Sequence, residues 1–185
     1  KCKKLDLQEA IITAQRAITG KSSMPILNGL KLTASDNKII LIGSDIDLSI
    51  ETKINADVEE EGTIVIDSRL FGEIIRKLPD DNISISTIEN NSVEILCQKS
   101  KFTLIYMNAE DFPEIPNIKE NMIFSIPQKI LKNMIKSVIF ATAQDETRPI
   151  LTGVLFEIKN KKLNLIALDG YRLALRSENL NTDNI

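Results

Sequence analysis

Apolar and polar residues alternate along this chain with two different periods. Apolar residues at every third or fourth position predict amphipathic helices, whereas strict alternation predicts half-buried strands. Three helices are predicted, at residues 7–19, 68–78 and 127–138. Ten strands are predicted, at residues 30–34, 38–43, 47–55, 63–66, 83–88, 93–98, 102–107, 154–158, 162–168 and 171–177. One helix with three strands after it therefore occurs three times, which indicates an α+β protein with antiparallel sheets.

Residues that favour helix ends lie beside the predicted helices. Asp6 is suited to cap the first helix, which we expect to stop at Gly20. Asp67 or Ser68 is expected to cap the second helix, and Pro127 suits the first turn of the third. All three helices therefore have a start signal in the sequence.

A short motif that occurs twice indicates an internal duplication. The segment Pro25-Ile26-Leu27-Asn28-Gly29 recurs as Pro149-Ile150-Leu151-Thr152-Gly153, at an offset of 124 residues (149 minus 25). The same offset separates Asp45 from Asp169. A constant offset over matched strands predicts that a whole structural unit is repeated.

The segment 111–117 contains two prolines and no periodic pattern, so it is the expected domain boundary. We expect a first domain at residues 1–117, built from two helix-plus-strand modules. Residues 118–185 are expected to form the first half of a second, truncated domain.

Composition narrows the classes of function. Histidine is absent, which removes the commonest acid–base residue and a frequent metal ligand, and so disfavours an enzyme. Two cysteines are too few for a disulfide-stapled secreted module, and no apolar stretch is long enough for a membrane span or a signal peptide. We expect a cytoplasmic protein that uses no cofactor or metal and does not contact a membrane.

Positive charge is concentrated on the predicted helices although the net charge is −3. Lys129, Lys132 and Lys136 share one face of the third helix, and the second helix contributes Arg69 and Arg76. Flexible cations without interleaved aromatic residues suit the phosphate backbone of duplex DNA better than single strands. On charge alone, a DNA-binding surface and an ordinary solvated helix face both remain open.

Four motifs are specific enough to indicate a family. They are Met24-Pro25-Ile26-Leu27, Asp111-Phe112-Pro113, Arg148-Pro149-Ile150-Leu151-Thr152-Gly153-Val154 and Leu168-Asp169-Gly170-Tyr171-Arg172-Leu173-Ala174. In these motifs the chain resembles the bacterial DNA sliding clamps, the β subunits of DNA polymerase III, over about the first half of such a subunit. The resemblance implies a homodimeric ring with strands outside and helices lining a hole for duplex DNA. We therefore expect a non-catalytic fragment of a processivity clamp that does not close a ring by itself.

The resemblance also implies roles for individual residues. Lys21 lies where the family has a basic DNA-contacting loop residue, and the helix cations named above would face the hole. Phe102 and Leu104, on an expected edge strand, match residues that pack against the partner subunit. A pocket for peptides of the polymerase III catalytic subunit, the clamp loader and other clamp-binding proteins would be formed by Arg148, Leu151, Gly170, Tyr171, Arg172 and Leu173. Each of these residues could instead be ordinary core or surface.

Two other functions are compatible with the sequence. Asp45, Asp47 and Asp169 could hold Mg²⁺ in a phosphoryl-transfer enzyme. Because Asp45 and Asp169 are equivalent positions of the two repeats, a turn role common to both explains them better. The other alternative is a module that binds peptides without encircling DNA.

Overall fold

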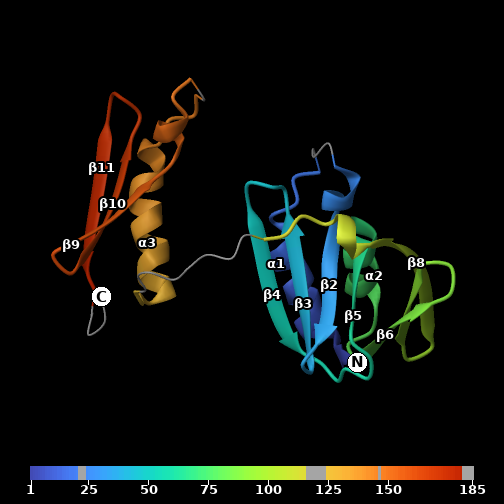
Figure 1. Cartoon of the computed structure of the whole chain (residues 1–185). Helices are drawn as coiled ribbons and strands as arrows, with labels where there is room; N and C mark the ends of the chain where they lie inside the picture. The colour runs from blue at the N-terminus through green and yellow to red at the C-terminus, as the bar shows by residue number, and fades with distance from the viewer. Residues whose placement is uncertain (21–23, 116–123, 146, 181–185) are drawn as a thin grey trace. The chain divides into compact units, whose positions relative to one another are not determined.

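The computed structural model divides the chain into two compact units, Lys1–Pro116 (unit 1) and Asn117–Ile185 (unit 2), which are described separately (Figure 1). The structure describes residues 1–20, 24–115, 124–145 and 147–180. In both units the paired strands are antiparallel.

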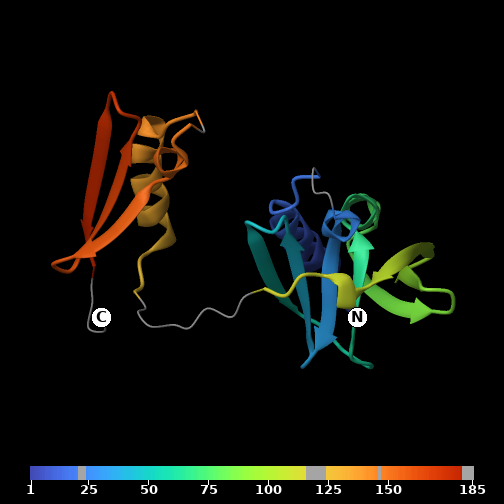
Figure 2. The same ribbon diagram turned by 45° about the horizontal axis from the view of Figure 1, so that its top comes forward.

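Unit 1 contains an eight-stranded sheet in the order β1-β6-β7-β8-β5-β2-β3-β4. Its elements in chain order are β1 (Cys2–Lys3), α1 (Lys4–Gln15), η1 (Pro25–Asn28), β2 (Gly29–Ser35), β3 (Lys38–Ser44), β4 (Ser49–Asn55), β5 (Gly62–Asp67), α2 (Ser68–Lys77), β6 (Asn82–Ile88), β7 (Ser92–Cys97), β8 (Ser100–Asn108) and η2 (Ala109–Asp111). In the turned view of Figure 2, α1 and α2 both lie against one side of this sheet.

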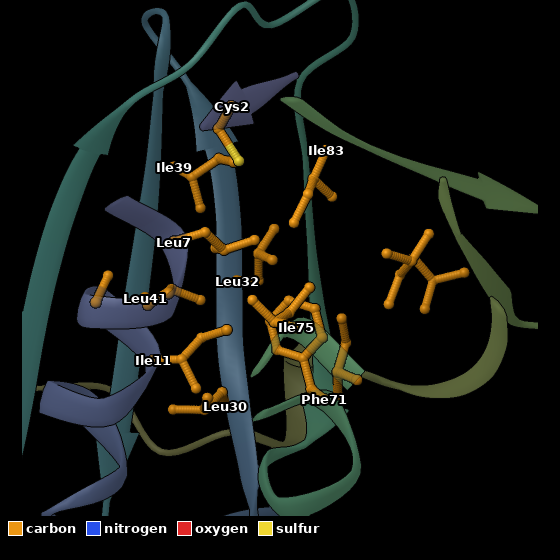
Figure 3. Packing of buried hydrophobic residues seen from close by; sticks show 14 of the residues in the cluster. Cys2, Leu7, Ile11, Leu30, Leu32, Ile39, Leu41, Phe71, Ile75 and Ile83 are labelled. Atoms are coloured by element: carbon orange, nitrogen blue, oxygen red, sulfur yellow. The ribbon is translucent and has the colours of Figure 1, made fainter. Parts of the chain in front are cut away.

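The main core of unit 1 lies between the two helices and the sheet (Figure 3). Leu7 and Ile11 of α1 and Phe71 and Ile75 of α2 are at most 1% exposed and pack in one cluster with Leu32 of β2. Burying one such side chain stabilises the fold by about 1.5–3 kcal/mol. The apolar faces of the two helices therefore hold them on the sheet and leave their polar faces to solvent.

The start of α1 differs from the expectation. The helix begins at Lys4, so Asp6 lies within its first turn and does not cap it. Strand β1 pairs with β6, and the Lys4 N–H donates to the carbonyl oxygen of Asp81 at 3.1 Å, so contacts with a distant segment set the start. The helix also ends at Gln15, before the expected stop at Gly20. By contrast, Asp67 caps α2 as predicted.

Strand β8 is not the edge strand that the sequence suggested, because it lies between β7 and β5 in the sheet. Its two partner strands nevertheless pair with different parts of it. Residues 100–105 pair with β7, whereas β5 pairs only with residues 106–108. Strand β5 cannot continue along β8, since the chain turns into α2 at Asp67. Within the described residues, the 100–105 segment of β8 therefore keeps one edge without a strand partner.

Unit 2 consists, in its described residues, of a three-stranded sheet in the order β11-β10-β9 and one α-helix. Its elements are α3 (Gln128–Val138), η3 (Ile139–Ala141), η4 (Pro149–Thr152), β9 (Leu155–Lys159), β10 (Lys162–Leu168) and β11 (Leu173–Asn179). Met134 and Val138 of α3 are at most 1% exposed and pack on Leu163 and Leu165 of β10.

The start and the apolar face of α3 differ in detail from the prediction. Pro127 is the N-cap residue and not the first helical residue. Ile130, at helical spacing from the buried Met134, is nevertheless 39% exposed and does not belong to the cluster that packs on the sheet.

The predicted duplication is visible in the register of the strands. Lys31 pairs with Ile42 in unit 1, and Leu155 pairs with Ile166 in unit 2, which is the same pair shifted by 124 positions. Strands β2, β3 and β4 therefore correspond to β9, β10 and β11, and the loops between them correspond as well.

Candidate nucleic-acid interface and docking cleft

The two arginines predicted to face DNA are exposed on α2. Arg69 forms an i,i+4 ion pair with Glu73, with Nε 3.3 Å from Oε1. Such exposed pairs contribute only about 0–1 kcal/mol, so this contact is easily exchanged for a phosphate. Arg76 forms no ion pair with the described residues. Both arginines border a groove of about 340 Å³ between α1 and α2.

The lysines of α3 form a second basic surface, on unit 2. Lys129, Lys132 and Lys136 are exposed, away from the buried Met134 and Val138, and none forms an ion pair with a described residue. All three ammonium groups are thus available to solvent anions. Lys21, the remaining predicted DNA contact, lies outside the described residues.

An open cleft of about 650 Å³ lies in unit 2, where residues 142–145, 147, 148 and Leu151 meet the β10–β11 loop. The structure brings five of the predicted pocket residues into its lining: Arg148, Leu151, Gly170, Tyr171 and Arg172. Leu173 is not among the lining residues, because it is already the first residue of β11 and is paired with Leu168. It is 64% exposed.

The β10–β11 loop is held in shape by the carboxylate of Asp169. Its Oδ1 accepts the N–H groups of Tyr171 and Arg172, each at 3.0 Å, and its Oδ2 accepts Arg172 Nε at 2.9 Å. These bonds, the two backbone N–H groups first, hold the pKa of Asp169 below its usual range. Gly170 has a φ of +93°, which glycine adopts without steric cost. The loop thus leaves the Tyr171 side chain fully exposed at the rim of the cleft.

Two contributors to this site were missed from the sequence. Phe140, in η3, lies under the Arg172 guanidinium, with the carbon Cζ 5.8 Å from the ring centroid. Asp169 was considered as a turn residue or a possible Mg²⁺ ligand, whereas in the structure its carboxylate also orients Arg172. The Asp-Gly pair was a usable signal for the loop geometry. An aromatic residue just past a helix end carried no such signal.

The residues expected at a subunit interface lie on the half-paired segment of β8. Phe102 is 40% exposed, and Ile105, three residues further along the same strand, is 78% exposed. Leu104 is partly buried and packs against the core of unit 1. This segment therefore combines an unpaired backbone edge with exposed apolar side chains.

The carboxylates considered for a metal site lie on two loops, one in each unit. Asp45 and Asp47 belong to the β3–β4 loop of unit 1, and Asp169 to the corresponding loop of unit 2. In the described part of the chain, no group of three or more His, Cys, Asp or Glu side chains is arranged to hold a metal ion. The helices of that part are all too short or too polar to cross a membrane.

Two family models match the chain. The DNA polymerase III beta subunit, N-terminal domain, matches residues 1–116, and the central domain of the same subunit matches residues 125–185. The chain belongs to the DNA polymerase III β-subunit family. It is 39% identical over 169 residues to the beta sliding clamp of Halalkalibacterium halodurans. The matched region covers 87% of this chain and 44% of that relative. It is 36% identical over 182 residues to the beta sliding clamp of Bacillus subtilis, covering 94% of this chain and 48% of the relative.

Solved structures of β-subunit family members have the same fold. The crystal structure of the DNA polymerase sliding clamp from Bacillus subtilis superposes with a TM-score of 0.92 at 35% identity and covers 98% of this chain and 50% of that one. The DNA polymerase III beta subunit from Thermotoga maritima superposes with a TM-score of 0.86 at 30% identity, covering 98% of this chain and 50% of that one. The predicted α+β sliding-clamp fold is therefore confirmed. The chain spans about half the length of the relatives it matches.

Proposed function

We propose that this chain is part of a non-catalytic processivity clamp, a cytoplasmic homodimeric ring that encircles duplex DNA and tethers the replicative polymerase to it. The observation that carries the proposal is the pair of exposed basic helix faces on α2 and α3, found in a β-subunit family chain with a net charge of −3. The relatives that it matches are named beta sliding clamps.

The helix cations suit a partner that must move along the protein. Arg76 and the three lysines of α3 are long, flexible and free of ion pairs with described residues, so they can exchange between phosphates without ordered base contacts. Contacts of this kind attract any duplex sequence and weaken as salt rises. They hold the duplex in the ring and leave it free to slide.

The DNA proposal is tested by charge reversal in the full-length protein that contains this chain. Lys132→Glu/Lys136→Glu should reduce the amount of clamp retained on circular DNA after loading. It should also lower the slope of log affinity against log salt by about two if each lysine contacts one phosphate. Lys159→Glu/Lys162→Glu is the matched control, because it makes the same charge change at the β9–β10 turn. Equal retention of both variants would show that α3 does not face DNA.

The half-paired edge of β8 supports the homodimer. Free backbone groups beside exposed Phe102 and Ile105 allow another chain to extend the sheet and cover apolar surface. Phe102→Arg in the full-length protein should shift the species seen by sedimentation velocity from dimer to monomer. Ile88→Arg, at an exposed residue of β6, is the control. A Phe102→Arg protein that stays dimeric would place the interface elsewhere.

The cleft of unit 2 supports docking of partner peptides from the polymerase catalytic subunit and the clamp loader. Its volume lies in the usual range for ligand sites, and Leu151 and Tyr171 provide apolar contacts beside the charges of Arg148 and Arg172. These arginines favour a peptide that carries acidic as well as apolar side chains.

Peptide docking is tested by fluorescence anisotropy with a labelled peptide from the polymerase tail. Tyr171→Ala/Arg172→Ala should weaken binding at least tenfold, whereas Leu175→Ala, an exposed residue of β11 outside the cleft, should leave it unchanged. Unchanged binding by the double variant would exclude the cleft. Intact peptide binding together with failure of the full-length protein to stay on DNA would instead favour a module that does not encircle DNA.

A further inference from the structure

The loop between β3 and β4, residues 45–48, has an unusual backbone. Asp45 closes it twice: its Oδ1 accepts the Leu48 N–H at 2.8 Å, and its own N–H donates to the Leu48 carbonyl oxygen at 3.1 Å. Between them, Ile46 has a φ of +86°. Among the described residues, Ile46 is the one β-branched side chain at positive φ, since the others are Asn, Asp, Gln and Lys. A β-branched residue is strongly disfavoured there.

The duplicated unit shows how the same loop is built without this strain. In the β10–β11 loop, 124 positions later, Asp169 Oδ1 accepts the Arg172 N–H, and the Asp169 N–H donates to the Arg172 carbonyl oxygen at 3.3 Å. The residue equivalent to Ile46 is Gly170, with a φ of +93°. The loop therefore has a glycine solution within the same chain, and unit 1 has an isoleucine in its place.

Burial in unit 1 does not offset the strain. Ile46 is 63% exposed and Leu48 is 50% exposed, and neither belongs to a described hydrophobic cluster. A strained backbone position that displays an aliphatic side chain to solvent indicates that the side chain has a use outside the unit. The equivalent loop of unit 2 displays Tyr171 beside the docking cleft in the same way.

The charges around the two loops are opposite. Asp45 and Asp47 alternate with the two aliphatic residues in unit 1, and neither forms an ion pair with a described residue. The cleft of unit 2 instead carries Arg148 and Arg172. We propose that the 45–48 loop docks a short linear peptide that combines aliphatic side chains with Lys or Arg. This site goes beyond the proposed function, because it lies on the other unit and selects the opposite charge.

The proposal is tested by selecting peptides on the full chain from a displayed random library. Peptides are recovered that bind the wild-type chain but not Ile46→Gly/Leu48→Ser, and their affinities are measured by anisotropy. The control Ile88→Gly/Leu70→Ser removes the same kinds of exposed side chain elsewhere in unit 1. Loss of binding in the loop variant would not come from unfolding. Ile46→Gly relieves the strained backbone position and should raise the melting temperature of that variant.

The expected result is a set of peptides rich in Leu or Ile with Lys or Arg. Their affinity should fall at least tenfold in the loop variant and stay unchanged in the control, and Asp47→Lys should reverse the charge preference. The proposal is overturned if no selected peptide depends on Ile46 and Leu48, or if the dependent peptides are acidic. Peptides lost on Tyr171→Ala/Arg172→Ala would report the unit 2 cleft, so the two sites are distinguished.

Discussion

Helix α1 crosses β3 so closely that Gly43 has no room for a side chain. A Cβ atom at Gly43 would lie 2.2 Å from the carbonyl oxygen of Ala14 and 2.9 Å from its carbonyl carbon. Such contacts essentially never fall below 3.0 Å, so Gly43→Ala must move α1 away from the sheet by roughly 0.8 Å (3.0 minus 2.2). The obstacle is backbone, which cannot rotate aside as a side chain can.

The cost of this shift follows from what α1 buries. Leu7 and Ile11 are at most 1% exposed on the same helix. A gap of about 0.5–1 Å loses about a quarter to a half of each dispersion contact, and a buried Leu makes about 40–60 contacts of about 0.1–0.2 kcal/mol. Partial relaxation brings the expected loss to about 3 kcal/mol, at the upper end of what overpacking usually costs.

The measurement is equilibrium urea unfolding followed by circular dichroism. Gly43→Ala should lower the midpoint with an unchanged slope, which reports a change of stability. Gly62→Ala is the matched control, because a Cβ atom at Gly62 meets nothing within 4 Å. This control should be neutral or stabilising by about 0.5–1 kcal/mol. A Gly43→Ala protein within about 0.5 kcal/mol of wild type, the usual effect of an uncrowded surface change, would refute the close approach of α1 and β3.

Three further predictions concern single groups. Asp67→Ala removes the hydrogen bond to the Leu70 N–H and should lower the free energy of unfolding by about 1 kcal/mol, measured by urea unfolding. Asp67→Asn should retain most of that stability, because Asn is also a good N-cap residue. Equal losses of stability in the two variants would argue against capping by Asp67. Burial raises the pKa of the Cys2 thiol from 9.0 to about 11, so the stability of the protein should fall as pH rises across that interval. Alkylation of Cys2 in the native protein at pH 9, followed by mass spectrometry, should be slow. Fast labelling would show that Cys2 is accessible to solvent. The lowered pKa of Asp169 means that the β10–β11 loop should keep its hydrogen bonds as pH falls through about 3.9, the pKa of the carboxylate in the unfolded chain. The bonds should be lost only at the lower pKa of the folded protein, as an NMR titration would show. Arg172→Ala should raise the midpoint of that titration, and an unchanged midpoint would exclude the contact between Arg172 and Asp169.

Features that depend on neighbouring residues were predictable from the sequence. The strand predicted at residues 162–168 has the bounds observed for β10, because every second residue from Leu163 to Ala167 is apolar and is buried against the core. Asp67 was recognised as a helix cap, since an N-cap bond reaches only three residues along the chain. The pocket residues were predicted from the family resemblance rather than from local pattern, and five of them line the unit 2 cleft.

Features that depend on distant segments were not predictable. Strand β1 is only two residues long and exists because it pairs with β6, which follows about 80 positions later. That pairing moved the start of α1 ahead of Asp6. The half-paired edge of β8 depends on where β5 turns into α2. The contact between Phe140 and Arg172 requires η3 to lie beside the β10–β11 loop, which follows about 30 residues later.

The duplicated Pro-Ile-Leu motif separates what the sequence determined from what the tertiary structure decided. The sequence alone determined that the motif occurs twice at a constant offset. In the structure both copies form a short 3-10 helix, which was not predicted from the sequence. Only the tertiary structure decided its burial: Ile26 is 8% exposed, whereas its counterpart Ile150 is 87% exposed. The first copy is covered by Phe112, which comes from more than 80 residues away. Burial is a property of the segments that meet at a site, and a local pattern does not contain that information.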